Sequence, residues 1–305
     1  MRTDRLRAQR EGFAVRFGCA AAALALAGCT ALVGEGAYTY DVDPCEPVDE
    51  SLCGEGATRY FVVASVALAE SRDGTLEGFD LDGTDATVCA REDAFGPGGR
   101  AGIDNAISPL LAGLEIVRGG DFGGDVREAI LRGESLSVVE VGGIDADGDD
   151  PCVEVRFRSG RVPDGVAAPE AYLDADGDGA LDRDLTLDFG AVEQSDRRAC
   201  VIDGVLHARV DGRAVSPLPA SGVPTERFRL RAEVREADLT RGVVGGSFRV
   251  EDVIAELERG GLGEPTITPF VQAAADLDFD GERCRSLSYA FSFSTVPFDP
   301  GALRP

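Results

Sequence analysis

The stretch Arg227-Phe-Arg-Leu-Arg-Ala-Glu-Val-Arg235 alternates polar and apolar side chains, with polar residues at the odd positions and apolar residues at the even ones. Successive side chains of a β-strand point to opposite faces of the sheet. The alternation therefore predicts an antiparallel strand that is buried on one face and solvated on the other. The stretch Tyr289-Ala-Phe-Ser-Phe-Ser294 shows a similar pattern.

The strand pattern continues through most of the chain after residue 58. The predicted strands are rich in β-branched or aromatic residues, and they cover Arg59–Leu68, Ser135–Val141, Val153–Arg158, Leu185–Phe189, Val201–Val210, Phe228–Val234, Val243–Phe248 and Leu287–Thr295. Helical spacing predicts three short helices: one capped by Asp104 or Asn105, one from Asp125 to Gly133, and one ending at Gly260. We therefore expect a mainly β fold in one domain, residues 58–305. The expected architecture is a β-sandwich or jelly-roll-like barrel with about three short helices in insertions.

The first 28 residues have the pattern of a secretory signal peptide. Five Arg residues precede the apolar run Gly18–Ala27, which is shorter than the roughly 20 residues that a membrane-spanning helix needs. The run ends in Leu26-Ala27-Gly28-Cys29, in which two small residues precede the cysteine.

This motif resembles the lipobox of bacterial lipoproteins. The resemblance implies a diacylglycerol thioether on Cys29, cleavage before it and N-acylation (palmitate), so that the chain is anchored to a membrane by lipid. The alternative is an ordinary signal peptide cleaved near Ala27, with Cys29 unmodified. Thr30 follows the cysteine in place of the Asp that retains enterobacterial lipoproteins in the inner membrane. We therefore expect the cell envelope as the location, and the outer membrane more than the inner one.

Residues 29–57 predict a tether, because they are rich in Gly, Pro and acidic residues and lack apolar periodicity. Twenty-eight flexible residues would span roughly 30 Å. Such a tether would hold the domain clear of the bilayer surface.

The charge of the chain limits its partners. After Cys29 there are 25 basic and 53 acidic residues, a formal net charge of −28, and every basic residue is Arg. A polyanionic chain disfavours nucleic acid or anionic lipid as a partner and favours divalent cations or cationic partners. Alternatively, the negative charge serves only to keep the protein soluble.

Six cysteines remain when Cys19 in the signal and Cys29 in the lipobox are set aside. An even number in an exported chain predicts disulfides, here among Cys45, Cys53, Cys89, Cys152, Cys200 and Cys284. The sequence permits fifteen connectivities. We expect Cys45–Cys53 to close a small loop, and Cys152–Cys200 and Cys89–Cys284 to form the other pairs.

The stretch Asp174-Ala-Asp-Gly-Asp-Gly-Ala-Leu-Asp182 matches positions 1, 3, 5, 6 and 9 of an EF-hand-type calcium loop. The bidentate Glu of position 12 is absent, because Leu185 stands there, and a strand follows in place of a helix. The stretch thus resembles the calcium loops found between strands of extracellular proteins. It predicts a structural calcium ion bound by Asp174, Asp176, Asp178 and Asp182. The alternative is an acidic turn without metal.

Two further sets of carboxylates are candidate calcium ligands. Asp80 and Asp82, with Asp104 and Asn105, could form one non-local site, although two turns and a helix cap explain them equally well. Asp276, Asp278 and Asp280 repeat the D-x-D-x-D spacing and precede Gly281. A last D-x-D-x-D, from Asp145 to Asp149, has Asp150 where Gly is wanted.

A resemblance extends beyond the lipobox. Gly78-Phe-Asp-Leu-Asp-Gly83, Gly102-Ile-Asp-Asn105 and Cys284-Arg-Ser-Leu-Ser288 resemble segments of a group of acidic lipoproteins from GC-rich Gram-negative bacteria whose activities are not established. The resemblance implies an envelope location and no particular chemistry.

The sequence favours a non-enzymatic function. No G-x-S-x-G, P-loop or H-E-x-x-H motif is present, and His207 is the only histidine. We expect a lipid-anchored cell-envelope protein with structural calcium that contacts an envelope protein or a glycan. The alternative is a calcium-dependent carbohydrate-binding module or glycoside hydrolase on a jelly-roll scaffold, which needs only two carboxylates. The absence of Trp weakens that alternative, because sugar rings stack on aromatic platforms.

Overall fold

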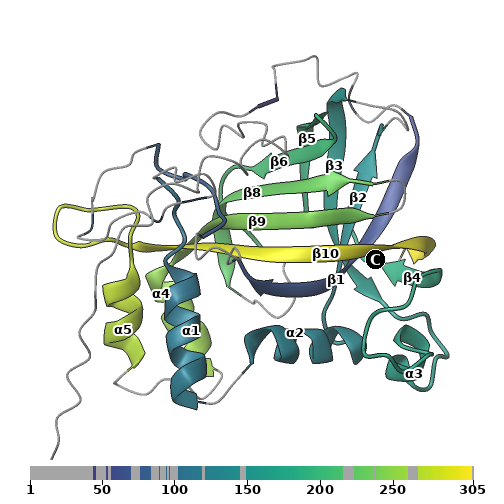
Figure 1. The fold of residues 1–305 in the computed structure, drawn as a ribbon, viewed down its shortest axis with the longest axis horizontal. Coiled ribbons are helices and arrows are strands. Elements are labelled where there is room, and N and C mark those ends of the chain that lie inside the picture. Colours follow the sequence, from purple (N-terminus) through teal and green to yellow (C-terminus); the bar gives the residue numbers. More distant parts are fainter. Residues whose placement is uncertain are drawn as a thin grey trace, which may run out of the picture. The chain divides into compact units, whose positions relative to one another are not determined.

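Figure 1 shows the fold in a computed structural model of the chain. The structure describes residues 44–45, 53, 56–69, 76–83, 89, 94, 96, 102–118, 121–144, 149–215, 223–235, 238–259 and 267–303. All of them belong to the unit Thr39–Pro305. The predicted signal peptide, Cys29, most of the predicted tether and Asp145 lie outside the described residues.

Ten strands and five helices make up the described part of the chain. The strands are β1 (Thr58–Leu68), β2 (Leu136–Gly142), β3 (Asp150–Arg161), β4 (Leu185–Phe189), β5 (Gln194–Ile202), β6 (Val205–Val210), β7 (Ala214–Val215), β8 (Pro224–Val234), β9 (Leu239–Arg249) and β10 (Ser286–Leu303). The helices are α1 (Ile107–Arg118), α2 (Phe122–Leu131), α3 (Pro169–Leu173), α4 (Val250–Arg259) and α5 (Ile267–Ala274).

Eight strands form a closed antiparallel barrel. They pair in the order β1-β2-β3-β5-β6-β8-β9-β10, and β10 pairs with β1 to close the circle. The closing register runs from Phe61 opposite Pro297 to Leu68 opposite Phe291. These eight strands take the same order around the barrel as along the chain, which is the order of an up-and-down barrel. The chain is mainly β, but the predicted β-sandwich or jelly-roll architecture is wrong, because one sheet closes on itself.

Side chains fill the interior of the barrel. Phe157 on β3 and Phe228 on β8 lie 5.1 Å apart between ring centroids, although β5 and β6 separate their strands in the sheet. The two rings therefore meet across the barrel. Tyr289 stacks on Phe248, and its hydroxyl group lies 2.7 Å from the Thr225 hydroxyl. Complete burial raises the pKa of Tyr289 despite that hydrogen bond.

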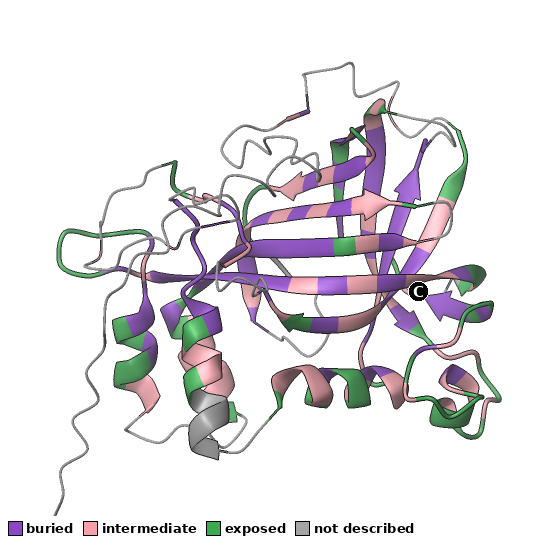
Figure 2. Ribbon diagram, in the orientation of Figure 1, coloured by how far each residue is buried: buried purple, intermediate pink, exposed green. Residues whose placement is uncertain are grey.

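Strand β8 confirms the predicted alternation. Phe228, Leu230 and Ala232 are at most 2% exposed, whereas the Arg residues between them are partly exposed. Figure 2 shows this alternation along the strand. The predicted strand Val201–Val210 is instead a hairpin of β5 and β6, which turns at Asp203 and Gly204 with φ values of 50° and 72°. Two consecutive residues with positive φ are typical of the tight turns that match strand twist.

The helices were predicted in part. Helices α1, α2 and α4 lie where the 3.6-residue pattern predicts them, and α3 and α5 were not predicted. Helix α2 begins earlier than expected, because Asp121 rather than Asp125 caps it by accepting a hydrogen bond from Gly124 N–H. Gly133 follows α2 with φ +70°, as its predicted role as a left-handed cap requires.

The barrel has two different ends. At one end, which we call the turn end, short connections join β2 to β3 (residues 143–149), β5 to β6 (203–204) and β8 to β9 (235–238). At the other, the helix end, long connections carry all five helices: residues 69–135 carry α1 and α2, residues 162–184 carry α3, and residues 250–285 carry α4 and α5. The N-terminal residue of β1, Thr58, pairs with Gly142 at the turn end.

Three disulfides link the described cysteines: Cys45–Cys200, Cys53–Cys152 and Cys89–Cys284, with Cα–Cα distances of 5.5, 4.8 and 5.9 Å. Cys89–Cys284 is the predicted pair. The predicted pairs Cys45–Cys53 and Cys152–Cys200 are wrong. Cys152 and Cys200 lie on the paired strands β3 and β5, and each bonds to a cysteine of the N-terminal segment instead of to the other.

Candidate calcium-binding loops

The first candidate site is the loop that follows α3. Carboxylate oxygens of Asp174, Asp176 and Asp178 all lie within 4.8 Å of one another. Gly177 and Gly179 adopt φ values of +73° and +79°, which let the backbone bend between the acidic residues. The structure thus brings together three of the four predicted ligands of this loop.

Backbone amides hold the three carboxylates in place. Asp174 Oδ2 accepts a hydrogen bond from Gly179 N–H (3.0 Å), Asp176 Oδ1 from Asp178 N–H (3.1 Å), and Asp178 Oδ1 from Ala180 N–H (2.8 Å). Asp174 Oδ1 is buried and has no hydrogen-bond partner. A buried polar atom without a partner is costly and calls for an explanation such as an ion.

Asp182, the fourth predicted ligand, lies outside this group. Its Oδ2 accepts a hydrogen bond from Ala175 N–H at 2.7 Å, and its own N–H donates to Leu173 O at 2.8 Å. Asp182 therefore closes the base of the loop.

The second candidate set is non-local, and three of its four residues lie together in the structure. Oxygens of Asp80, Asp82 and Asp104 lie within 4.8 Å of one another, because a bridge between Phe79 and Asp104 joins the two segments. Asp104 is only 2% exposed, and its Oδ2 accepts a hydrogen bond from Leu81 N–H at 2.6 Å. Two stretches separated by more than twenty residues thus meet in one carboxylate group.

Asn105 has a structural role beside this group. Its Oδ1 accepts hydrogen bonds from Ser108 N–H (3.3 Å) in the first turn of α1 and from Ala290 N–H (3.2 Å) on β10. Its amide nitrogen donates to Glu77 O at 3.2 Å. Asn105 therefore caps α1, as predicted, and ties the helix to the barrel.

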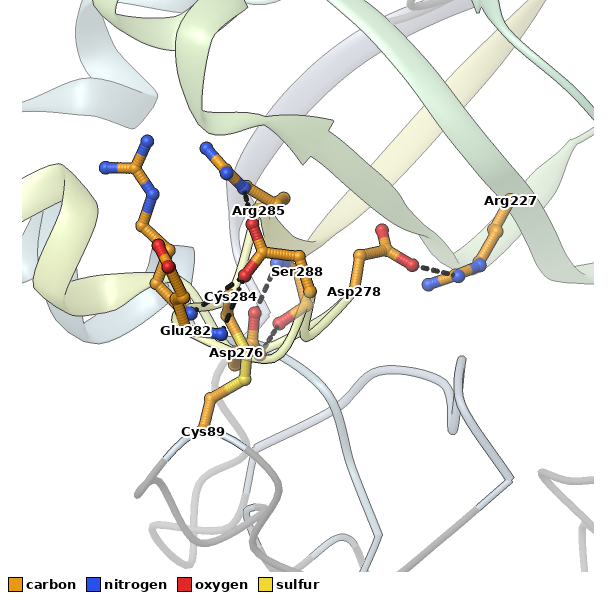
Figure 3. The surroundings of a disulfide bond; sticks show 10 residues. Cys89, Arg227, Asp276, Asp278, Glu282, Cys284, Arg285 and Ser288 are labelled. Atoms are coloured by element: carbon orange, nitrogen blue, oxygen red, sulfur yellow. Dashed lines mark hydrogen bonds and ion pairs between the residues drawn. A yellow bond between two sulfur atoms is a disulfide. The ribbon is translucent and has the colours of Figure 1, made fainter.

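The third candidate set is not brought together, because each carboxylate has a partner of its own (Figure 3). Asp276 accepts hydrogen bonds from the backbone N–H (2.8 Å) and the hydroxyl of Ser288. Asp278 pairs with Arg227 at 2.5 Å. Asp280 accepts from the backbone of Glu282 and Arg283 and pairs with Arg285. These contacts fix the loop that leads to Cys284.

The contribution of Asp280 to the stability of the folded chain is expected to depend on pH. Hydrogen bonds from the backbone N–H of Arg283 and Glu282, and then the Arg285 side chain, lower its pKa from 3.8 to about 2. A depressed carboxyl pKa stabilises the fold above the unfolded value, and this contribution is lost as the pH falls from about 4 to about 2. In thermal melts followed by circular dichroism, the stability gap between the native chain and Asp280→Asn should narrow over that window. A gap that stays constant down to pH 2 would contradict this expectation.

The sequence did not reveal a polar pocket at the helix end. Its volume is about 470 Å³, and its described lining residues are Glu226, Arg249, Glu251, Asp278, Arg285 and Ser286. No aromatic ring is among them. The residues come from β8, β9, α4, the loop before β10 and the first residue of β10, so no local spacing could have pointed to the pocket. The Arg249 guanidinium lies 2.8 Å from the Glu226 carboxylate.

Three further ionisable side chains, those of His207, Glu233 and Asp238, contact other residues of the fold. His207 lies on β6 opposite Cys200, and its carbonyl oxygen lies 3.9 Å from the sulfur of Cys45. Glu233 pairs with Arg235 and Arg241, and Asp238 pairs with Arg183. The glycoside hydrolase alternative stays a prediction, with no pair of carboxylates assigned to it.

Comparisons with family models, curated proteins and solved structures found no match to the chain. Within the described ranges, none of the helices is long and apolar enough to cross a bilayer.

Proposed function

We propose that the chain is a lipid-anchored, non-enzymatic cell-envelope protein whose barrel carries structural calcium in the Asp174–Asp178 loop. In this role the barrel contacts an envelope protein or a glycan. The observation that carries the calcium proposal is the buried, unpartnered Asp174 Oδ1 within a group of three carboxylates.

Electrostatics supports a cation in this loop. Three carboxylates within 4.8 Å repel one another, and the chain already carries a large negative charge. Calcium takes six to eight oxygen ligands and tolerates irregular geometry. Asp174, Asp176 and Asp178 would supply three or more of these oxygens, and backbone carbonyls and water would complete the shell. The absence of His and Cys from the group favours a hard cation over zinc.

The second carboxylate group is a second candidate for the same ion. Asp104 is almost completely buried there, beside the half-exposed Asp80 and the exposed Asp82. An ion at this place would fix the connection between β1 and α1 at the helix end.

Calcium is expected to raise the melting temperature of the mature chain, residues 30–305. A ligand that binds only the folded state, at 100 times its dissociation constant, stabilises by about 2.7 kcal/mol. Unfolding is followed by circular dichroism, with excess EDTA against millimolar calcium. Asp176→Asn should lose most of the shift, whereas Asp278→Asn, in the D-x-D-x-D stretch that does not assemble, should keep it. A shift lost only in Asp80→Asn would assign the ion to the second group. If calcium does not shift the melting temperature of the native chain, the calcium proposal is overturned.

The anchor is tested by Cys29→Ala. Without the thiol no thioether to diacylglycerol can form, so the protein should move from the membrane fraction to the soluble fraction of cells. Cys19→Ala is the matched control, because it removes a cysteine of the predicted signal without touching the lipobox. Continued fractionation of Cys29→Ala with membranes would overturn the proposed anchor.

A further inference from the structure

We propose that the turn end of the barrel is the side held toward the lipid surface, and that the helix end, with the carboxylates of Asp80, Asp82 and Asp104, faces away from it. The proposal rests on the lipid anchor at Cys29. It concerns which surface of the barrel meets the membrane, a question that the anchor alone leaves open.

Two disulfides attach the N-terminal segment to the turn end. Cys152 lies near the start of β3 and Cys200 near the end of β5, and the register of these paired strands places both at this end. They bind Cys53 and Cys45, respectively. The segment then enters β1 at the same end, where the carbonyl of Ala57 accepts a hydrogen bond from Gly143 N–H at 3.0 Å.

The Cys45–Cys200 disulfide shortens the connection to the lipid. Cys45 lies 16 residues after Cys29, and a chain of that length reaches at most about 55 Å when fully extended. Without the two disulfides the first attached residue would be Thr58, 29 residues after Cys29, with a limit of about 100 Å. On the random-coil estimate the separation falls from about 30 Å to about 22 Å. The attached end therefore stays nearer to the bilayer than the far end.

The far end carries one carboxylate group and the polar pocket. Asp80, Asp82 and Asp104 lie in the connection from β1 to α1, which leaves the barrel at the helix end, and residues of β8, β9 and α4 line the pocket there. The Asp174–Asp178 loop is not assigned to either end, since Arg183, five residues after Asp178, pairs with Asp238 at the turn end. The orientation therefore leaves the Asp80, Asp82 and Asp104 group and the pocket open to partners outside the membrane.

Single tryptophans can test this orientation, since the natural chain has none. Arg235, just after β8 at the turn end, has a side chain that is 62% exposed, and Phe270 on α5 is 66% exposed. Figure 1 shows the end of β8 and α5 on opposite sides of the barrel. The acylated full-length mature protein is reconstituted in phosphatidylcholine vesicles that contain a dansyl-labelled lipid. Energy transfer to the dansyl group should be stronger from Arg235→Trp than from Phe270→Trp.

The second part of the experiment removes the two disulfides that attach the N-terminal segment to the turn end. A variant that combines Cys45→Ser, Cys53→Ser, Cys152→Ser and Cys200→Ser should show a smaller difference in energy transfer between the two probes. The pair Cys89→Ser and Cys284→Ser should preserve the difference, because that disulfide does not hold the N-terminal segment. Equal transfer from both probes in the otherwise native chain, or stronger transfer from Phe270→Trp, would overturn the orientation. Bound vesicles in that case would leave the lipid anchor intact, whereas protein with Cys29 that fails to bind vesicles would overturn the anchor itself.

Discussion

Phe157→Ala is expected to lower the free energy of unfolding by about 3–5 kcal/mol, the usual range for deleting a buried aromatic ring. Phe157 is 2% exposed and touches Phe228 across the barrel at a centroid distance of 5.1 Å. Neighbouring strands cannot fill the space that its ring leaves, because the closed sheet fixes their positions. The measurement is urea unfolding of the mature chain followed by circular dichroism.

Phe270→Ala is the matched control for this experiment. The chemical change is the same, but Phe270 on α5 is 66% exposed, so its loss should change stability by no more than about 0.5 kcal/mol. A double-mutant cycle with Phe228→Ala should give a coupling of about 0.5–1.5 kcal/mol, as expected for an aromatic pair in contact. Additive effects of Phe157→Ala and Phe228→Ala would mean that the two rings do not meet.

The alternation in β8 could be predicted from sequence, but closure of the barrel could not. Alternation tells which side chains are buried, and it identified Phe228, Leu230 and Ala232 correctly. Closure depends on pairing between β1 and β10. Paired residues such as Phe61 and Pro297 lie more than 200 positions apart in the chain. Nothing in either strand alone distinguishes a sheet that closes on itself from two stacked sheets with the same buried faces.

The cysteines show the same limit. Cys45 and Cys53 are near each other in sequence, which favoured a small loop between them. Instead, each forms a disulfide with a different cysteine of the paired strands, Cys200 on β5 or Cys152 on β3. This arrangement exists only once the two strands have paired. Sequence proximity was therefore a poor guide to the pairing.

Local spacing was a better guide to the carboxylate groups. Asp174, Asp176 and Asp178 come together because glycines bend a short loop, a property that the sequence contains in full. The same spacing at Asp276, Asp278 and Asp280 yields no group. Arg227, which pairs with Asp278, comes from a strand about fifty residues away. Spacing predicts where carboxylates can converge, but not which of them meet a cation from elsewhere in the fold.

Loss of the two N-terminal disulfides is the second prediction with a large expected effect. Cys45–Cys200 and Cys53–Cys152 join residues 155 and 99 positions apart in the chain. On the chain-entropy model, a crosslink that closes a loop of about 100 residues stabilises by about 4–5 kcal/mol, since it restricts the unfolded chain. Replacing both pairs by serine should thus lower the free energy of unfolding by at least about 4 kcal/mol.

The two contributions should not add, because one loop lies inside the other. Cys53–Cys152 is the inner pair and Cys45–Cys200 the outer one. While the inner pair is intact, the outer pair closes a much shorter stretch of chain. Removing either pair alone should therefore lower the free energy of unfolding by less than removing the outer pair from a chain that lacks the inner one. Urea midpoints of the single-pair and double-pair variants, compared with and without dithiothreitol, measure this coupling. A variant with all six cysteines replaced is the control, because the reductant should leave its midpoint unchanged. Strict additivity would show that the unfolded chain does not gain freedom as the nested loops require, and that the disulfides act instead by holding the N-terminal segment against β3 and β5.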